Sequence, residues 1–377
     1  MLPYGRQRID DEDVDAVVEA LRGKLITQGP TIERFEAAVA EYLDAKHVVA
    51  FANGTAALHG AAFAAELGPG DEVVTSPLSF ASSANCVLYQ GATPRFVDIA
   101  PQTWNLDTAV AAARVDDRTR AVVAVSFAGL PVDLEPLEPV RDRVVVIEDA
   151  AHALGARRAG KPVGGPGGAD MTTFSLHPVK AITTGEGGLV STDDDGLAHR
   201  LRLFRTHGIT KDSVKPSPEE GDWYYEMQVL GFNYRITDFQ CALGLSQLRS
   251  LDERIARRNE IAERYRELLA DETRVSLPPG ATEGSLHAYH LFVVLILAGA
   301  KGRLETFSAL RRAGVGVQVH YIPIYRHPYY RDVLGYAQDA YPATEDYYWS
   351  AISLPMFPDM TESDIQRVVT ELRGALP

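Results

Sequence analysis

The sequence predicts an α/β protein, with a mostly parallel seven-stranded sheet in a large domain and a smaller C-terminal α/β domain. Between positions 48 and 192, short β-branched runs alternate with Ala- and Leu-rich helical runs, which is typical of a parallel sheet covered by helices. After Thr237 the pattern changes to a long amphipathic helix. The chain has 377 residues, which is more than one hydrophobic core usually serves, so two domains are expected.

Seven apolar segments are the predicted strands, and they comprise residues 47–51, 72–76, 94–99, 121–127, 144–149, 171–175 and 187–192. In a parallel sheet, ligands bind outside the carboxyl ends of the strands, because loops and helix N-termini converge there. The loops that follow these strands are therefore the first place to search for chemistry.

The long helical pattern runs from Phe239 to Leu268 and predicts one helix that contains the domain junction. We therefore expect a large domain over residues 1–247 and a small domain over residues 248–377. Within the small domain, residues 290–297 and 315–325 are predicted strands, and residues 302–314 and 361–376 are predicted helices.

Composition limits the possible partners. The formal net charge is −14 and the chain has no run of Lys and Arg, so nucleic acid is not an expected partner. Cys86 and Cys241 fit no metal-ligand spacing, which predicts two reduced thiols packed as small hydrophobic groups and no metal. The chain shows neither a secretory signal nor a membrane span, and we expect a cytoplasmic protein.

Two charged residues lie on the ligand side of the predicted sheet. Asp149 ends an apolar strand, where a carboxylate is costly unless a cation such as a protonated pyridine nitrogen meets it. The alternative for Asp149 is the cap of a helix that begins at Ala150, and the sequence leaves both open. Lys180 connects two predicted strands, where a desolvated amine can form an imine. The ordinary alternative for Lys180 is a solvated surface lysine.

Other candidate residues surround these two. Gly54 and Thr55 begin a predicted helix whose N-terminus attracts anions, although in this segment alone capping without a ligand is the more ordinary interpretation. If the anion is a phosphate group, the Ser175 hydroxyl could donate a hydrogen bond to it. Phe80 and His152 could flank a planar cofactor on its two faces, or they could be ordinary buried side chains.

Eight segments together resemble the DegT/DnrJ/EryC1/StrS family of sugar aminotransferases, and the resemblance covers essentially the whole chain. The segments are ITQGP at 26–30, NGTAAL at 53–58, PLSFASSAN at 77–85, EDAAHALGA at 148–156, FSLHPVKAITTGEGG at 174–188, LFRTHGI at 203–209, GFNYRITDFQCALGLSQL at 231–248 and VHYIPIY at 319–325. The resemblance implies the fold type I architecture of enzymes that use pyridoxal 5'-phosphate (PLP).

The resemblance also implies roles for individual residues. Lys180 would be the catalytic residue, which holds PLP as a Schiff base and moves protons, and Asp149 would hold the pyridine nitrogen. The remaining cofactor-binding residues would be Gly54, Thr55, Phe80, His152, Ser175 and Asn233. Asn233 would reach the cofactor of a neighbouring subunit, which implies a homodimer with shared active sites. The implied substrate-binding residues are Tyr4, Lys24, Leu25, Ile26, Thr27, Val319, His320, Tyr321 and Ile322.

Within the family, the segments look most like the UDP-4-amino-4,6-dideoxy-N-acetyl-β-L-altrosamine transaminases of pseudaminic acid biosynthesis. That likeness implies transfer of an amino group from L-glutamate to a UDP-linked 4-keto-6-deoxy sugar. One alternative is an aminotransferase for a dTDP- or GDP-linked keto sugar. The sugar 3-dehydratase branch has a histidine in place of the lysine, so Lys180 argues against it. A non-catalytic homologue would be expected to lack Lys180, Asp149 or Ser175, and all three are present.

Overall fold

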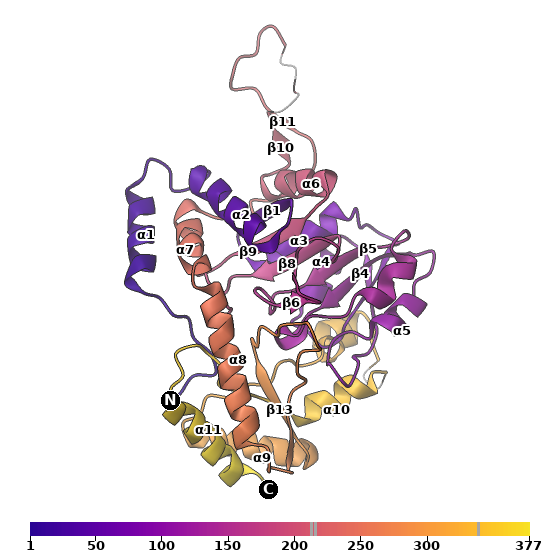
Figure 1. The fold of residues 1–377 in the computed structure, drawn as a ribbon. Coiled ribbons are helices and arrows are strands. Elements are labelled where there is room, and N and C mark those ends of the chain that lie inside the picture. Colours follow the sequence, from indigo (N-terminus) through magenta and orange to yellow (C-terminus); the bar gives the residue numbers. More distant parts are fainter. Residues whose placement is uncertain (212–213, 215–216, 338–339) are drawn as a thin grey trace.

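The computed structural model describes residues 1–211, 214, 217–337 and 340–377. Its central sheet has seven strands in the order β1-β9-β8-β5-β4-β2-β3 (Figure 1). Strand β9 is antiparallel to both of its neighbours, and the other pairs are parallel. All seven predicted strands are confirmed. Their bounds are β1 (His47–Phe51), β2 (Glu72–Thr75), β3 (Thr93–Phe96), β4 (Thr119–Val125), β5 (Val145–Asp149), β8 (Met171–Ser175) and β9 (Gly188–Thr192).

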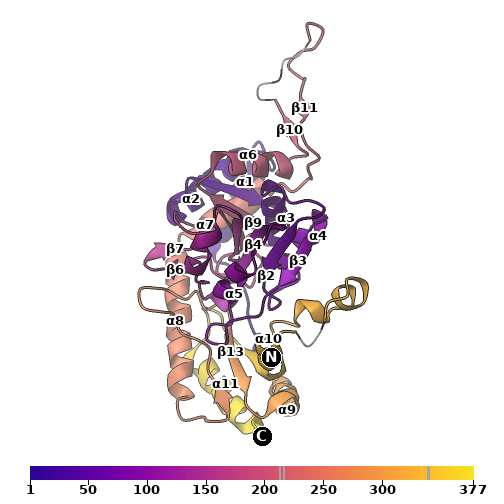
Figure 2. The ribbon, with the colours of Figure 1, turned by 90° about the vertical axis from the view of Figure 1, so that its right-hand side faces the viewer.

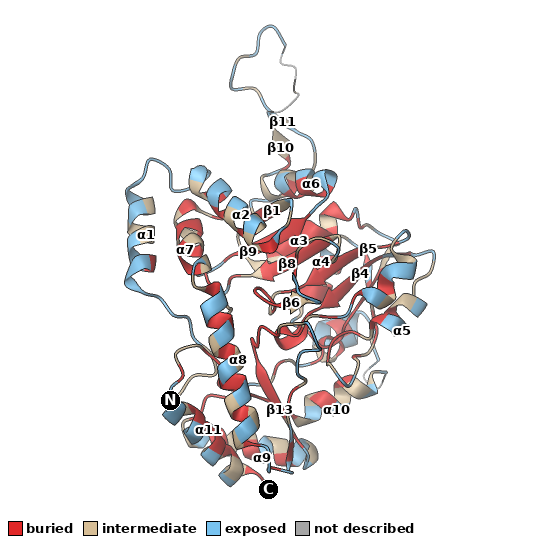
Figure 3. Cartoon of the chain, in the orientation of Figure 1, coloured by how far each residue is buried: buried red, intermediate tan, exposed pale blue. Residues whose placement is uncertain are grey.

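Helices cover both faces of this sheet because successive strand residues point to opposite sides. In β1, Val49 and Phe51 pack in the cluster with α3 (Gly54–Ala64), whereas Val48 and Ala50 pack in the cluster with α2 (Pro30–Leu43). The strands are mostly buried (Figure 3), with exposed positions at Thr93 in the edge strand β3 and at Arg120 in β4. The other helical elements of this half are α1 (Asp11–Arg22), α4 (Ser82–Tyr89), α5 (Thr108–Ala113), η1 (Phe127–Gly129), η2 (Glu135–Val140) and α6 (Asp195–Arg205).

A smaller antiparallel sheet forms the core of the C-terminal part. Strand β13 (Phe292–Ile296) lies between β12 (Val275–Ser276) and β14 (Ala351–Leu354), and α9 (Gly299–Arg312) and α11 (Glu362–Ala375) complete the layer. The remaining elements are η3 (Ile324–Arg326), η4 (Tyr329–Val333) and α10 (Pro342–Ser350).

The predicted strand over residues 315–325 was wrong. This segment forms only isolated bridges, one from Val315 to Leu2 and one from Gln318 to Ser353. Its backbone is shared between the N-terminal segment and a single residue of β14, so no continuous ladder can form.

The single long helix expected after Thr237 was also wrong. The chain forms α7 (Asp238–Leu248) and α8 (Leu251–Leu268), with a break at residues 249–250. Helix α8 runs from the large sheet to the small one (Figures 1 and 2). Its first turns contribute Ile255 to the core cluster of α2 and α7, and later turns contribute Tyr265 to the C-terminal cluster. A division at residues 247 and 248 remains a prediction, since α8 packs in both cores.

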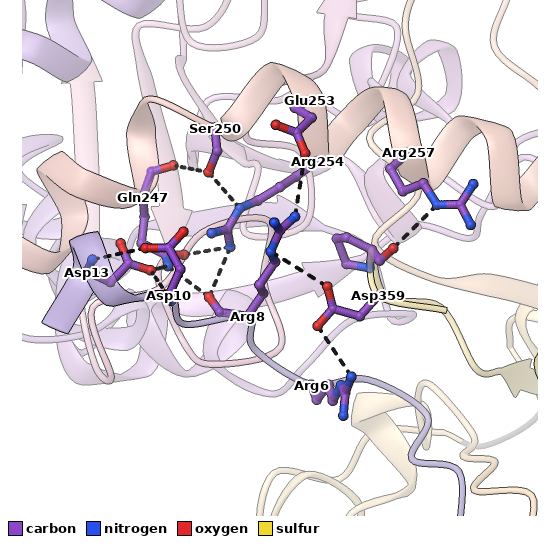
Figure 4. A network of polar contacts seen from close by, with 11 residues as sticks. Arg6, Arg8, Asp10, Asp13, Gln247, Ser250, Glu253, Arg254, Arg257 and Asp359 are labelled. Carbon is purple, nitrogen blue, oxygen red and sulfur yellow. Dashed lines mark hydrogen bonds and ion pairs between the residues drawn. The ribbon is translucent and has the colours of Figure 1, made fainter. Parts of the chain in front are cut away.

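A buried polar network fastens the N-terminal segment to the α7–α8 junction (Figure 4). The Gln247 side-chain amide donates to the Asp13 carboxylate and to the Arg8 carbonyl at 2.9 Å. Arg254 donates to the Gln247 amide oxygen at 2.7 Å, and the Arg8 guanidinium pairs with Asp359 at 3.7 Å. The segment before α1 is therefore held against both halves of the protein.

Two short hairpins leave the main body. Strands β10 (Ile209–Thr210) and β11 (Glu226–Met227) form an arm that projects away from the sheet (Figures 1 and 2). Strands β6 (Arg157–Arg158) and β7 (Lys161–Pro162) form the other hairpin. Both cysteines are free and buried, which confirms that they pack as small hydrophobic groups. Within the described ranges, no helix combines the length and the apolar character that crossing a membrane requires.

Candidate active site

A cavity of about 630 Å³ opens at the carboxyl ends of the parallel strands, as expected for this fold. It lies between the large sheet and the C-terminal segments. The predicted site residues that line it are Tyr4, Gly54, Thr55, Phe80, Asp149, His152, Ser175, Lys180, His320 and Tyr321. The loops singled out in the sequence therefore meet around one space.

The other predicted residues lie outside this cavity, and they are Lys24, Leu25, Ile26, Thr27, Asn233, Val319 and Ile322. Segment 24–27 and Asn233 are exposed and belong to one region of the surface. Thr27 forms a bridge with Thr237, and Asn233 forms a bridge with Thr206. Both groups are thus tied to the segment around residues 233–237, and neither lines the cavity of its own chain, although Tyr234 does.

Asp149 is 4% exposed, at the end of β5. Its carboxylate accepts hydrogen bonds from the Ser83 hydroxyl at 2.6 Å and from the Ala151 N–H at 3.2 Å. Burial raises the pKa of Asp149, while Ser83, Ala151 and the charge of Lys180 act in the opposite direction. Residues 150–156 form turns, so the alternative role of Asp149 as the cap of a helix is excluded. The site thus holds a buried carboxyl group whose charged form needs a cation.

Lys180 is only partly exposed and lies in the turn between β8 and β9. Desolvation lowers the pKa of Lys180 to about 8; the Asp149 carboxylate opposes this shift and the positive charge of Arg258 adds to it. An amine with such a pKa is partly neutral near neutral pH, which is the form that attacks a carbonyl group. The reading of Lys180 as an ordinary solvated lysine does not fit this environment.

His152 is held as a neutral ring of defined tautomer. Its Nδ1 accepts from the Ala128 N–H at 3.2 Å, so the proton lies on Nε2, which donates to the Tyr321 hydroxyl at 3.1 Å. Burial lowers the pKa of His152 well below its usual value, and the nearby Lys180 and His320 act in the same direction. The ring therefore offers a flat, uncharged surface to the cavity.

The N-terminus of α3 forms an anion cradle. Asn53 caps the helix by accepting from the Ala56 N–H at 2.8 Å, and the first N–H groups of a helix have no partner within it. A Cβ atom on Gly54 would lie 3.0 Å from Cβ and 3.2 Å from Oγ of Ser175. Glycine at position 54 therefore lets the Ser175 hydroxyl approach the start of the helix, where both can face an oxyanion.

Sequence reasoning missed several cavity residues. One of them is Ser79, whose Oγ lies 2.6 Å from Oγ of Ser83; Ser83 itself does not line the cavity, but its hydroxyl donates to Asp149. The four-residue spacing of the two serines after β2 is the only sequence signal for this pair. His290 also lines the cavity and is 7% exposed, and its Nδ1 has no hydrogen-bond partner. A histidine directly before an apolar strand is usually a core residue, so the sequence alone gave no reason to place His290 in the site. The cavity also includes Tyr89, Glu186 and Tyr234.

These groups fit the chemistry of PLP. The buried carboxyl of Asp149 matches a protonated pyridine nitrogen, the Lys180 amine matches an aldehyde, and the α3 N-terminus matches a phosphate. The fold and the cavity thus define a PLP-dependent enzyme of fold type I.

Comparison with known proteins identifies the family. Residues 7–373 match the DegT/DnrJ/EryC1/StrS aminotransferase family, and the chain belongs to it. This family is PLP-dependent, and the protein is therefore a PLP-dependent aminotransferase of the sugar aminotransferase type. The resemblance found in the sequence is confirmed.

Individual relatives match along almost their full length. The spore coat polysaccharide biosynthesis protein SpsC of Bacillus subtilis (strain 168) is 38% identical over 377 residues, which cover 99% of this chain and 96% of SpsC. Helicobacter pylori PseC, an aminotransferase involved in the biosynthesis of pseudoaminic acid, has a TM-score of 0.92 at 31% identity and covers 100% of this chain and 99% of its own. The PLP form of Spr1654 from Streptococcus pneumoniae has a TM-score of 0.91 at 27% identity, with coverage of 100% and 99%.

Proposed function

We propose that the protein transfers the amino group of L-glutamate to UDP-4-keto-6-deoxy-N-acetyl-altrosamine, which yields the 4-amino sugar. The observation that carries this proposal is the whole-chain likeness to PseC, at 31% identity and a TM-score of 0.92. Six of the eight segments that carry the sequence resemblance, including those around Lys180 and Tyr321, contribute residues to the cavity; segments 26–30 and 203–209 do not. The substrate assignment therefore rests on likeness, and the chemistry rests on the site.

In the proposed site, Asp149 keeps the cofactor's ring nitrogen protonated and His152 lies against the ring near its hydroxyl side. Gly54, Thr55 and Ser175 bind the phosphate at the α3 N-terminus. PLP bound there supplies an electron sink for the electrons released at the carbon next to nitrogen. Phe80, which is 59% exposed, covers the ring from the cavity mouth.

Lys180 has two proposed tasks. It would hold the cofactor through its amine, and in its free form it would move a proton away from the α-carbon of the amino donor. A pKa of about 8 suits both tasks, because a general base works best when its pKa lies near the working pH. PLP would carry the amino group between the two substrates, so ping-pong kinetics are expected.

The sugar is proposed to lie against the wall formed by Tyr4, His320 and Tyr321. The Tyr4 and His320 ring centroids are 5.3 Å apart, and His320 Nδ1 lies 2.8 Å from Oγ of Ser353. Val319 and Ile322 flank this wall without lining the cavity, so a direct role for them would require substrate that extends beyond it.

We propose a homodimer in which each cavity is completed by the partner. Asn233 and segment 24–27 are exposed and do not line the cavity of their own chain, which is the arrangement expected of residues that serve a second subunit. In this arrangement Asn233 reaches the cofactor phosphate and segment 24–27 reaches the substrate of the other chain.

A dTDP- or GDP-linked keto sugar is the alternative substrate. The chain is 38% identical to SpsC and 31% identical to PseC. SpsC is a spore coat polysaccharide biosynthesis protein, and its name does not specify a UDP-linked sugar, so the alternative substrate stays a candidate. This alternative shares every proposed cofactor contact and differs only in the substrate.

The test is reverse transamination. The purified PLP form is incubated with 2-oxoglutarate and, in parallel, with UDP- and dTDP-linked 4-amino-4,6-dideoxy sugars, and glutamate formation is followed. Rapid conversion of the UDP-linked altrosamine alone supports the proposal. A preference for a dTDP-linked sugar would contradict the UDP-linked substrate and support the alternative. If none of the sugars is converted, the proposed activity is wrong.

A further inference from the structure

Arg258 is a buried cation without a carboxylate partner. Arg258 lies on α8 and is 1% exposed. Its Nη1 donates to the backbone carbonyls of Tyr289 at 3.1 Å, His290 at 3.4 Å and Met356 at 3.1 Å. Its Nε is buried and has no hydrogen-bond partner. Among the described residues, Arg258 has no ion pair with a carboxylate, and no acidic group favours its charged form. This is unusual, because buried charges are normally paired.

The neighbouring turn of the same helix shows the contrast. Arg254 is also buried, at 4% exposure, but it lies in the polar network of Figure 4. The carboxylates of Asp13, Asp10 and Asp359 all act on Arg254 and favour its charged form. For Arg258 no acidic group does so, and the positive charge of Arg254 adds to the cost of burial. The charge of Arg254 is thus balanced by nearby carboxylates, whereas the charge of Arg258 is not.

The unbalanced charge lies beside the wall of the cavity. Arg258 binds the carbonyl of His290, and the His290 side chain lines the cavity that contains Lys180. A charge without a counter-ion in a low-dielectric interior acts over a longer distance than one that is paired or solvated. The field of Arg258 therefore extends to the Lys180 amine.

Few other charges face Lys180. Asp149 supplies the one carboxylate that acts on it, and it opposes Arg258. The surrounding histidines are kept neutral, because burial lowers the pKa of each; these are His152, His290 and His320. Burial raises the pKa of Tyr321, so it is neutral as well. Glu186 and His177 line the same cavity, but neither is among the charges that shift the pKa of Lys180.

We propose that Arg258 is an electrostatic positioning residue of the active site, which favours the neutral form of the Lys180 amine and of the imine that Lys180 makes with PLP. It acts through space, and its guanidinium contacts only backbone carbonyls. The unpaired state of Arg258 is then functional, since a carboxylate beside it would cancel the field at Lys180. The inference rests on the proposed role of Lys180.

The test is a spectroscopic pH titration of the imine in the purified holoenzyme, which does not depend on turnover. Removing a positive neighbour raises the pKa of an amine or imine, so R258Q and R258M should move the titration midpoint upward. Removing one unpaired charge from such an interior, at an effective dielectric constant of about 20, should move the midpoint by on the order of one pH unit. R258K retains the charge and should titrate as the wild type does.

Two controls separate charge from structure. R254Q removes the neighbouring, balanced cation and should leave the midpoint unchanged, although both substitutions disturb the same helix. M356E leaves Arg258 in place and adds a carboxylate to the residue whose backbone carbonyl Arg258 contacts at 3.1 Å, so it should raise the midpoint even if the neutral Arg258 variants do not fold. Folded R258Q or M356E with the wild-type midpoint would overturn the inference. A wild-type protein without any borohydride-sensitive imine would instead overturn the proposed role of Lys180.

Discussion

Removing the Ser83 hydroxyl should weaken PLP binding without removing any group that touches the cofactor. The Ser83 Oγ donates to Asp149 Oδ2 at 2.6 Å, and Ser83 is fully buried. A hydrogen bond to a charged group contributes about 1.5–3 kcal/mol. S83A should therefore raise the pKa of Asp149 further, because it removes a hydrogen bond that favours the charged form.

That change should appear directly in the affinity for PLP. Burial already raises the pKa of Asp149, so a further increase leaves less carboxylate to pair with the protonated ring nitrogen. The same free energy corresponds to an affinity loss of about tenfold to a hundredfold. The assay titrates the apoprotein with PLP and follows the visible imine band, with melting temperature as a check on folding.

Two variants bracket the expected loss. S79A removes a hydroxyl that reaches Asp149 only through Ser83, at 2.6 Å from it, so its effect should be smaller. D149N removes the charge itself and should lose the most affinity. If folded S83A binds PLP as tightly as the wild type near neutral pH, then Ser83 does not support the charged form of Asp149, and this reasoning fails.

Three further perturbations test other parts of the site. G54A should weaken PLP binding, because the new Cβ would lie 3.0 Å from the Ser175 Cβ and 3.2 Å from its Oγ; folded G54A that binds PLP as tightly as the wild type would contradict the proposed phosphate site. Mixing inactive K180A and N233A chains should restore about a quarter of wild-type activity if sites are shared, because half of the dimers are hybrids with one intact site; no recovery after verified subunit exchange would contradict the shared site. Burial lowers the pKa of His59 to about 4, so this histidine stays neutral in the fold while the unfolded chain takes up a proton. Stability should therefore fall as pH drops from about 6.5 towards 4, and H59F should lessen that fall in melting temperature; an identical pH profile would refute it.

Much of the fold could be predicted because β-branched runs that end in polar turns carry a strong local signal. The sequence placed β1 and β8 at their observed bounds, 47–51 and 171–175. The rule for parallel sheets then placed Asp149 and Lys180 on one edge. A residue that follows a buried strand is positioned by that strand, so its location follows from local pattern alone.

The break between α7 and α8 could not be predicted in the same way. Apolar residues continue at helical spacing across positions 249–250, because Leu248 and Leu251 both belong to the cluster that α7 and α8 share. Neither glycine nor proline marks the break. The cause is tertiary, since Ser250 accepts from Arg254 at 2.9 Å and donates to the Gln247 carbonyl at 3.2 Å within the buried network.

The partners of the site residues were hidden for a related reason. Ser83 is 66 positions from Asp149, and Arg258 meets carbonyls that are 31, 32 and 98 positions away. A periodic pattern reports which face of an element a residue occupies, but it does not report what lies opposite. Opposing neighbours of this kind set the pKa of Lys180, since Asp149 raises it while burial and Arg258 lower it. Two members of this family with the same lysine and aspartate can therefore differ in the amine's charge at neutral pH, if one of them places a carboxylate beside its buried arginine.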